Sequence, residues 1–129
     1  MKEAADLARI LRTKASNDLT AARIGLDHHA PVDTRCFHVQ QAAEKLLKSA
    51  LAAKDADYPF THDLRELLEL ALPHYPLLDA FMETLPEYTE FAVRLRYDDV
   101  PSITRHDAVK ALREVEKLHE GLAESLRGL

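Results

Sequence analysis

The pattern of apolar and polar positions predicts a chain made of helices. Apolar residues recur every three or four positions in five stretches, which is the spacing that places side chains on one face of a helix. These stretches are residues 3–29, 36–51, 61–72, 76–95 and 104–126. None of them shows the strict alternation that is typical of a strand. We therefore predict an all-α fold, an up-and-down bundle of about five helices, as a single domain over residues 1–129.

The central helix is predicted at Cys36–Leu51, the longest uninterrupted run of strong helix formers. Asp33 or Thr34 is expected to cap its N-terminus. Small residues would let neighbouring helices approach closely, and Cys36 is expected to be a buried structural thiol. The expected apolar face consists of Cys36, Val39, Ala43, Leu46, Leu47, Ala50 and Leu51.

The first and third helices are expected to bury one leucine-rich stripe each. Thr61 is the expected N-cap of the third helix, and His62 and Asp63 beside it are explained by the helix start. The first stripe is Leu7, Leu11, Ala15, Leu19, Ala22 and Leu26, and the third helix points Leu64, Leu67, Leu68 and Leu70 inward.

The fourth helix carries Pro86, which we expect to kink it or to divide it into two pieces. The last helix follows Thr104 and Asp107, whose spacing resembles a capping box with Asp in place of the usual Glu. Its expected buried face is Ala108, Ala111, Leu112, Val115, Leu118, Leu122 and Leu126.

Charge and composition exclude some functions. The 22 acidic and 17 basic residues give a net charge of -5, which argues against nonspecific duplex binding by a whole-domain basic field but leaves a local basic patch open. There is no apolar run of membrane-spanning length, and charged residues occupy the start of the chain where a signal peptide would be apolar. We expect a cytoplasmic protein that contacts no membrane.

Three ordered motifs resemble the HEPN domain. They are CFHVQQAAEKLLKSAL, the THDLRELL helix start and the RYDD loop, and Asp18, Leu19 and Ala22 fit the family's D-L-x-x-A pattern in the first helix. Ala108 and Ala111 fit its final helix. The resemblance covers most of the chain.

The resemblance implies a helical bundle that forms a homodimer, often beside a small nucleotidyltransferase in a toxin-antitoxin pair. Catalytically active members resemble metal-independent RNases, with an Arg followed four to six residues later by a His late in the domain. Here the His that follows Arg94 and Arg96 is His106, which is farther along. A matching spacing occurs at the end of the first helix, between Arg23 and His28 or His29.

Arg96 and His106 are the candidate catalytic residues. A His can take the 2′-hydroxyl proton of RNA, and an Arg can hold the phosphate, if the DDVPSIT loop folds back to bring them together. In the other interpretation Arg96 pairs with Asp98 or Asp99 and His106 only occupies a first helical turn. The neighbouring Tyr97 is more typical of a packing residue with its hydroxyl in water than of a catalytic acid.

The candidate phosphate or nucleotide surface is a polar ladder on the central helix, formed by Gln41, Lys45 and Lys48. Lys supplies point charge and Gln can read a base edge, although a charged helical face is also typical of a simply solvated surface. The candidate ligand-binding residues are Arg35, His38, Gln41, Lys45, Lys48 and Tyr97.

Two hypotheses remain open. The first is a dimeric, noncatalytic module that binds a nucleotide or RNA, or docks a nucleotidyltransferase; the second is a metal-independent RNase toxin that uses Arg96 and His106 in a non-standard spacing. No cofactor is predicted. No metal is predicted either, because His28, His29 and His38 lack a fourth ligand at a recognisable spacing.

Overall fold

The structure is a computed structural model that describes residues 2–28, 32–88 and 104–126. These residues form α-helices and one 3-10 helix, with no strand among them, so the all-α prediction is confirmed. The elements are α1 (Lys2–Asp27), α2 (Val32–Ala53), α3 (Leu64–Ala71), the 3-10 helix η1 (Pro76–Phe81) and α5 (Arg105–Leu126).

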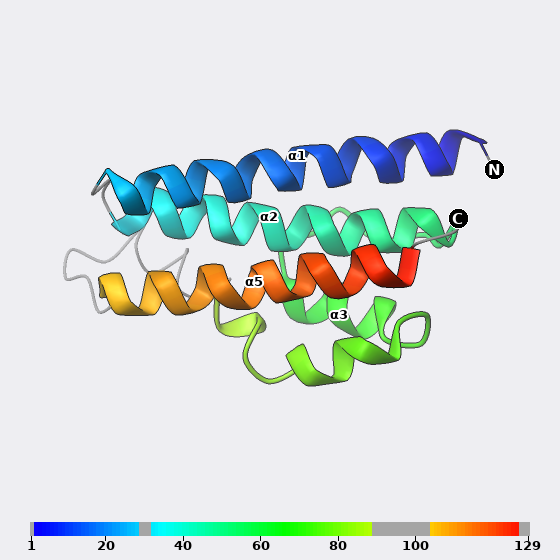
Figure 1. Cartoon of the computed structure of the whole chain (residues 1–129). Helices are drawn as coiled ribbons and strands as arrows, with labels where there is room; N and C mark the ends of the chain where they lie inside the picture. Colours follow the sequence, from blue (N-terminus) through cyan, green and yellow to red (C-terminus); the bar gives the residue numbers. More distant parts are fainter. Residues whose placement is uncertain (1, 29–31, 89–103, 127–129) are drawn as a thin grey trace.

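Helix α2 is the central element, as the sequence predicted. It packs against α1, α3 and α5, and Figure 1 shows α1, α2 and α5 lying side by side with α3 and η1 beneath them. Helix α1 runs opposite to α2, whereas α5 runs in the same direction as α2 (Figure 1). The beginnings of α2 and α5 therefore lie at the same end of the bundle as the end of α1.

The predicted apolar face of α2 is the core of the molecule. Its seven predicted residues are all buried, and Ala42 joins them. Ser49 on this face donates a hydrogen bond of 2.9 Å from its hydroxyl to the carbonyl oxygen of Ala8 in α1. Such a contact requires close backbones, which the small residues of both helices permit.

Two predicted helix caps are wrong. Helix α2 already begins at Val32, so Asp33 and Thr34 lie within its first turn and do not precede it. In α3 the N-cap is Asp63, whose backbone is extended and whose carboxylate accepts a hydrogen bond of 2.9 Å from the backbone N–H of Arg65. Thr61 supports this cap from outside, because its hydroxyl accepts from the N–H of Asp63 at 3.1 Å.

Two leucines predicted to point inward are exposed. Leu7 is 43% exposed and Leu70 is 38% exposed, whereas their neighbours Ala8 and Ala71 are buried. Both leucines lie at the margin of their stripes, where a shift of one position turns a side chain by about 100°. Small alanines, which let α1 and α3 approach α2, occupy the positions closest to it.

The predicted break at Pro86 is present. Helix η1 ends at Phe81, a turn follows, and helical structure resumes at Pro86 and continues through Tyr88. A proline is tolerated at the first helical position, because the N–H it lacks would have no partner there. The remainder of this predicted helix, residues 89–95, lies outside the described residues.

The sequence predicted α5 correctly. Thr104 and Asp107 form the expected capping box: the Asp107 carboxylate accepts from the N–H of Thr104 at 3.0 Å, and the Thr104 hydroxyl accepts from the N–H of Asp107 at 3.2 Å. All seven predicted apolar residues of this helix are buried.

A candidate nucleic-acid interface on α5

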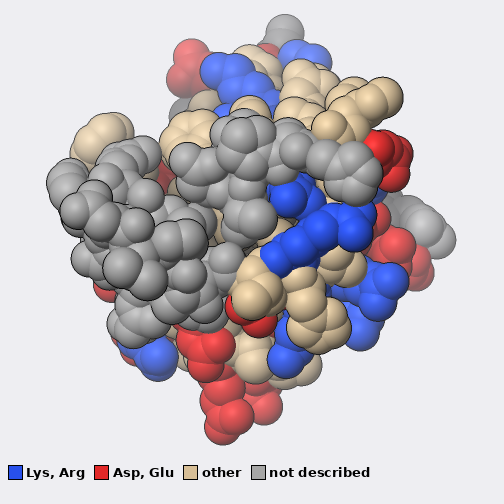
Figure 2. Space-filling model, turned by 90° about the vertical axis from the view of Figure 1, so that its left-hand side faces the viewer, with Lys and Arg blue, Asp and Glu red and all other residues tan. Residues whose placement is uncertain are grey.

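Basic side chains follow the outward face of α5. His106, Lys110, Arg113 and Lys117 are spaced by four, three and four positions, which places them on one stripe of a helix. The buried residues of α5 occupy the opposite face, and all four members of the stripe are exposed. Figure 2 shows basic side chains gathered on one side of the end of the bundle where α5 begins. We call His106, Lys110, Arg113 and Lys117 the α5 stripe.

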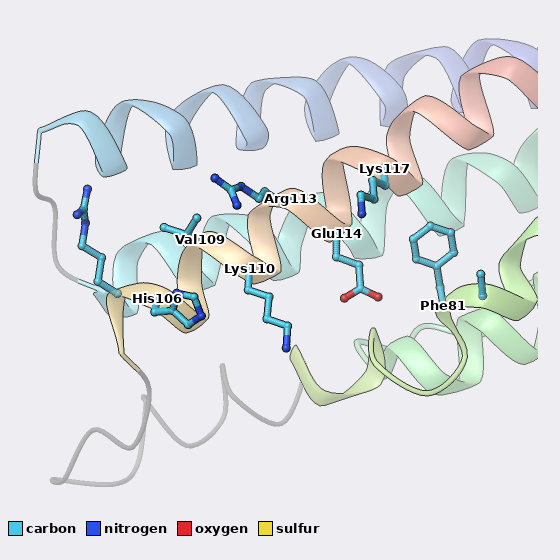
Figure 3. A pocket seen from close by; sticks show the side chains of 9 residues that line it. Phe81, His106, Val109, Lys110, Arg113, Glu114 and Lys117 are labelled. Atoms are coloured by element: carbon cyan, nitrogen blue, oxygen red, sulfur yellow. The ribbon is translucent and has the colours of Figure 1, made fainter.

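A groove of about 900 Å³ lies along the α5 stripe (Figure 3). Helix α5 provides one wall of the groove, and Ala80 and Phe81 at the end of η1 line it from the other side. Arg105 and Val109 complete the α5 wall beside the stripe. The groove thus combines a small apolar surface with four permanently cationic side chains.

The cations of the groove carry little compensating charge. The side chains of Lys110, Arg113 and Lys117 form no ion pair or hydrogen bond with any residue in the described part of the chain. Arg105 donates a hydrogen bond of 3.4 Å to the backbone carbonyl of Leu26, which links α5 to the end of α1 without neutralising the guanidinium. Positive charge is therefore available to a ligand.

Glu114 is the one carboxylate among the described lining residues, and two hydroxyl groups hold it. Thr84 and Tyr88 each donate a hydrogen bond to its carboxylate from the segment that follows η1. Burial raises the pKa of the Tyr88 hydroxyl above its usual value, and the Glu114 hydrogen bond raises it further. Tyr88 therefore stays protonated and fixes Glu114 toward that segment, as its direction in Figure 3 also shows.

The polar ladder predicted on α2 has a different character, because carboxylates beneath it bind its lysines. Asp18 of α1 lies 2.6 Å from Nζ of Lys45, and its other oxygen lies 3.0 Å from Nδ1 of His38. The side chains of Lys45 and His38 are only 26% and 30% exposed. This cluster joins α1 to α2 and leaves less free positive charge than the α5 stripe.

A second carboxylate binds the far end of the ladder. Glu44 is buried, and its carboxylate lies 2.6 Å from Nδ1 of His62 and 3.7 Å from Nζ of Lys48. His62 is thus more than a residue beside a helix cap, because it joins the loop before α3 to α2. The sequence interpretation missed this pair, since the two residues are distant in sequence and neither has a spacing that predicts the other.

The remaining predicted ligand residues are less accessible. Arg35 is 5% exposed, and its Nε and Nη1 atoms find no hydrogen-bond partner among the described residues. Gln41 is half-buried. Arg96 and Tyr97 lie outside the described residues. The structure therefore tests neither the pairing of Arg96 with His106 nor a role for Tyr97.

The family model of the HEPN domain matches residues 8–126. The chain belongs to the HEPN domain family. The match covers α1 from Ala8 onward and continues through α5, so the groove lies inside the HEPN domain. No similar protein was found among curated sequences, and none was found among solved structures.

Among the described residues, Arg23 with His28 and Arg113 with His119 both have the spacing of active HEPN relatives. Arg23 and His28 do not form a site. Arg23 donates two hydrogen bonds to Glu116 of α5, at 2.9 and 3.1 Å, and so joins α1 to α5. His28 is exposed just after α1, and no contact to Arg23 is present. His106, in contrast, lies on the groove and is exposed.

The described ranges contain neither a group of metal ligands nor a membrane-spanning helix. Within residues 2–28, 32–88 and 104–126, no three His, Cys, Asp or Glu side chains gather as metal ligands would. None of the described helices is both long and apolar enough to cross a membrane.

The sequence interpretation found His106 but missed Lys110, Arg113 and Lys117. The signal was present in the last helix, where basic residues recur at helical spacing opposite the leucines. The apolar positions of that helix predicted its buried face and gave no role to its basic residues.

Proposed function

We propose that this HEPN protein is an RNA-binding module that holds RNA phosphates in the groove along α5. The observation that carries the proposal is the α5 stripe itself, exposed and free of ion pairs within the described part of the chain. Lysine and arginine side chains are the usual partners of nucleic-acid phosphates. From His106 to Lys117 the stripe extends about 16 Å along the helix, which is long enough to contact more than one phosphate.

The acidic character of the whole chain is compatible with this proposal. The net charge of -5 keeps the protein as a whole from attracting RNA, so binding depends on the local field of the groove. Arg105, Lys110, Arg113 and Lys117 provide four positive charges there, and Glu114 provides one negative charge. A local cluster of this kind favours RNA binding at one face only.

The experiment compares RNA affinity between two double variants with equal loss of charge. Lys110→Ala/Arg113→Ala removes two groove cations, whereas Lys14→Ala/Arg65→Ala removes two exposed cations from α1 and α3. Fluorescence anisotropy with a labelled single-stranded RNA should show at least about tenfold weaker binding for the groove variant, because each charge-assisted contact contributes more than a neutral one. Equal weakening by both variants would place the RNA elsewhere.

A metal-independent RNase is the second candidate, favoured by the position of His106 on the groove. An imidazole there could take a proton from a 2′-hydroxyl while the stripe holds the phosphate. This candidate needs Arg96, or another cation, at the same phosphate. Because no His follows Arg94 or Arg96 at the compact spacing, we expect RNA cleavage to be weak or absent.

The RNase candidate is tested with purified protein and mixed RNA in a chelator, which stops contaminating metal-dependent nucleases. Wild type is compared with His106→Ala and Arg96→Ala. Robust cleavage by wild type that is lost in either variant would contradict the noncatalytic proposal. If wild type binds RNA but does not cleave it, the result supports the noncatalytic proposal.

We further propose that the chain forms a homodimer and pairs with a small nucleotidyltransferase in a toxin-antitoxin module. The support is membership of the HEPN family, because resemblance to this family implies a homodimer that often has a small nucleotidyltransferase as its partner. The nucleotide-binding role of Arg35, His38, Gln41, Lys45 and Lys48 also stays a proposal. The partnership is tested by co-expression with a nucleotidyltransferase encoded by a neighbouring gene, followed by size-exclusion chromatography. Elution as one complex supports the partnership, and elution as two separate proteins contradicts it.

A further inference from the structure

Phe60 is an aromatic ring that the fold leaves in solvent. It is 93% exposed, more than any other large apolar side chain in the described residues. The other large apolar side chains that are exposed lie on helices α1, α2 and α3, so Phe60 has no second apolar neighbour of this kind in residues 54–63. A protein-binding patch needs several such neighbours, and one isolated ring does not provide it.

The surroundings of Phe60 are polar, and Asp57 and Asp63 lie three residues to either side of it along the chain. Nζ of Lys48 lies 5.6 Å from the centre of the ring, and the ring of His62 meets it edge to face at 5.6 Å. Lys48 itself is close to Glu44, which holds its ammonium group near α2. The ring therefore has a lysine that is ion-paired with Glu44 beside it and an open surface toward solvent.

The backbone next to Phe60 is held in place. His62 is bonded to the buried Glu44, and its carbonyl oxygen accepts a hydrogen bond of 3.4 Å from Gln40. Asp63 then caps α3. Because these contacts fix the loop, ordering an incoming planar group against Phe60 costs less than on a free loop.

From these contacts we infer that Phe60 is a stacking site for an unpaired base of single-stranded RNA. An aromatic face stacks on any nucleobase, because every base has a π-face. The inference rests on the proposed RNA binding but uses a different surface, since Phe60 does not line the α5 groove. A duplex keeps its bases stacked and paired, so it gains nothing from Phe60.

The absence of tryptophan from the chain makes the test direct. Phe60→Trp introduces a single tryptophan at the site, and Phe37→Trp introduces one at a less exposed ring on α2 as the matched control. Emission of the Phe60→Trp variant should fall when a single-stranded oligouridylate is added and should not fall with a duplex of the same length. Emission of the Phe37→Trp variant should change with neither.

Affinity provides a second measurement. Phe60→Leu keeps an apolar side chain but removes the aromatic face, and it should weaken single-stranded RNA binding by roughly 5- to 150-fold. The fold should be unaffected, because the ring contributes almost no buried surface; an unchanged denaturation midpoint confirms this.

The outcomes separate this inference from the proposed function. Equal single-stranded RNA affinity in wild type and Phe60→Leu, with no quenching in Phe60→Trp, overturns the stacking site while groove binding stands. RNA binding by neither wild type nor any variant overturns both. Emission of Phe60→Trp that changes with protein concentration without RNA makes Phe60 a contact between copies and overturns the stacking site.

Discussion

The carboxylate of Glu44 and the imidazole of His62 lie 2.6 Å apart, although one belongs to α2 and the other to the loop before α3. Glu44 is buried, whereas the His62 side chain is 65% exposed. The exposed imidazole of His62 therefore provides a hydrogen-bond donor to the buried carboxylate of Glu44. It positions Phe60 on one side and the α3 cap on the other.

His62→Ala should destabilise the fold by about 1–3 kcal/mol, because the buried Glu44 carboxylate loses its nearest partner and keeps Lys48 at 3.7 Å. Chemical denaturation measures this change. In the Glu44→Gln background the same His62→Ala substitution should cost much less. Equal costs in both backgrounds would mean that the two residues do not stabilise the fold through each other.

Leu46→Ala should cost roughly 2–5 kcal/mol of unfolding free energy, because it removes a fully buried side chain and leaves a cavity. Leu70→Ala is the matched control, since Leu70 is 38% exposed. Its cost should be below about 1 kcal/mol. Urea denaturation of both variants checks the difference, and a reversed order would contradict the described core.

Asp107→Ala should destabilise α5 in a pH-dependent way. Hydrogen bonds from the backbone and hydroxyl of Thr104 lower the pKa of the Asp107 carboxyl below 3.8. A lowered folded-state pKa adds stability that is present above the ordinary pKa and is lost as the pH falls through the folded value. The difference in thermal midpoint between wild type and variant should thus be constant at neutral pH and shrink below about pH 4. A difference that grows with acid would contradict the capping role.

The proposed homodimer should bury more than roughly 1,000 Å² in total, which is the size of a stable specific interface. Light scattering should give twice the 14.6 kDa mass of the chain at tens of micromolar. A single species at the monomer mass would contradict the proposal. It would also exclude any catalytic site assembled from two copies.

Periodic apolar positions predicted most of the fold. The seven buried residues of α5 and the face of α2 follow from spacing alone, because a helix in a bundle must bury one continuous stripe. The prediction that Leu7 and Leu70 point inward was wrong because each lies at the edge of a stripe, where the position of the neighbouring helix determines which side is covered. Asp33 was wrong as a cap because helix ends depend on one turn of backbone, which composition does not fix.

The candidate site was less predictable. Lys45 and Lys48 were expected to offer free charge, but Asp18 and Glu44 lie beneath them, and sequence spacing gives no distance between different helices. The α5 stripe could have been found from spacing, since its basic residues share one helix. What sequence could not provide is the groove beside it, because Phe81 comes from the end of η1 and sequence spacing gives no distance between η1 and α5.

The most direct test of RNA binding at the α5 groove is the dependence of affinity on salt. Each phosphate contact with single-stranded RNA releases counterions, so the logarithm of the binding constant falls with the logarithm of salt concentration by about 0.7 per contact. Lys110→Ala/Arg113→Ala removes two contacts and should make the slope shallower by about 1.4. Lys14→Ala/Arg65→Ala should leave the slope as in wild type. The same slope in wild type and in the groove variant would contradict the proposal that α5 holds the RNA.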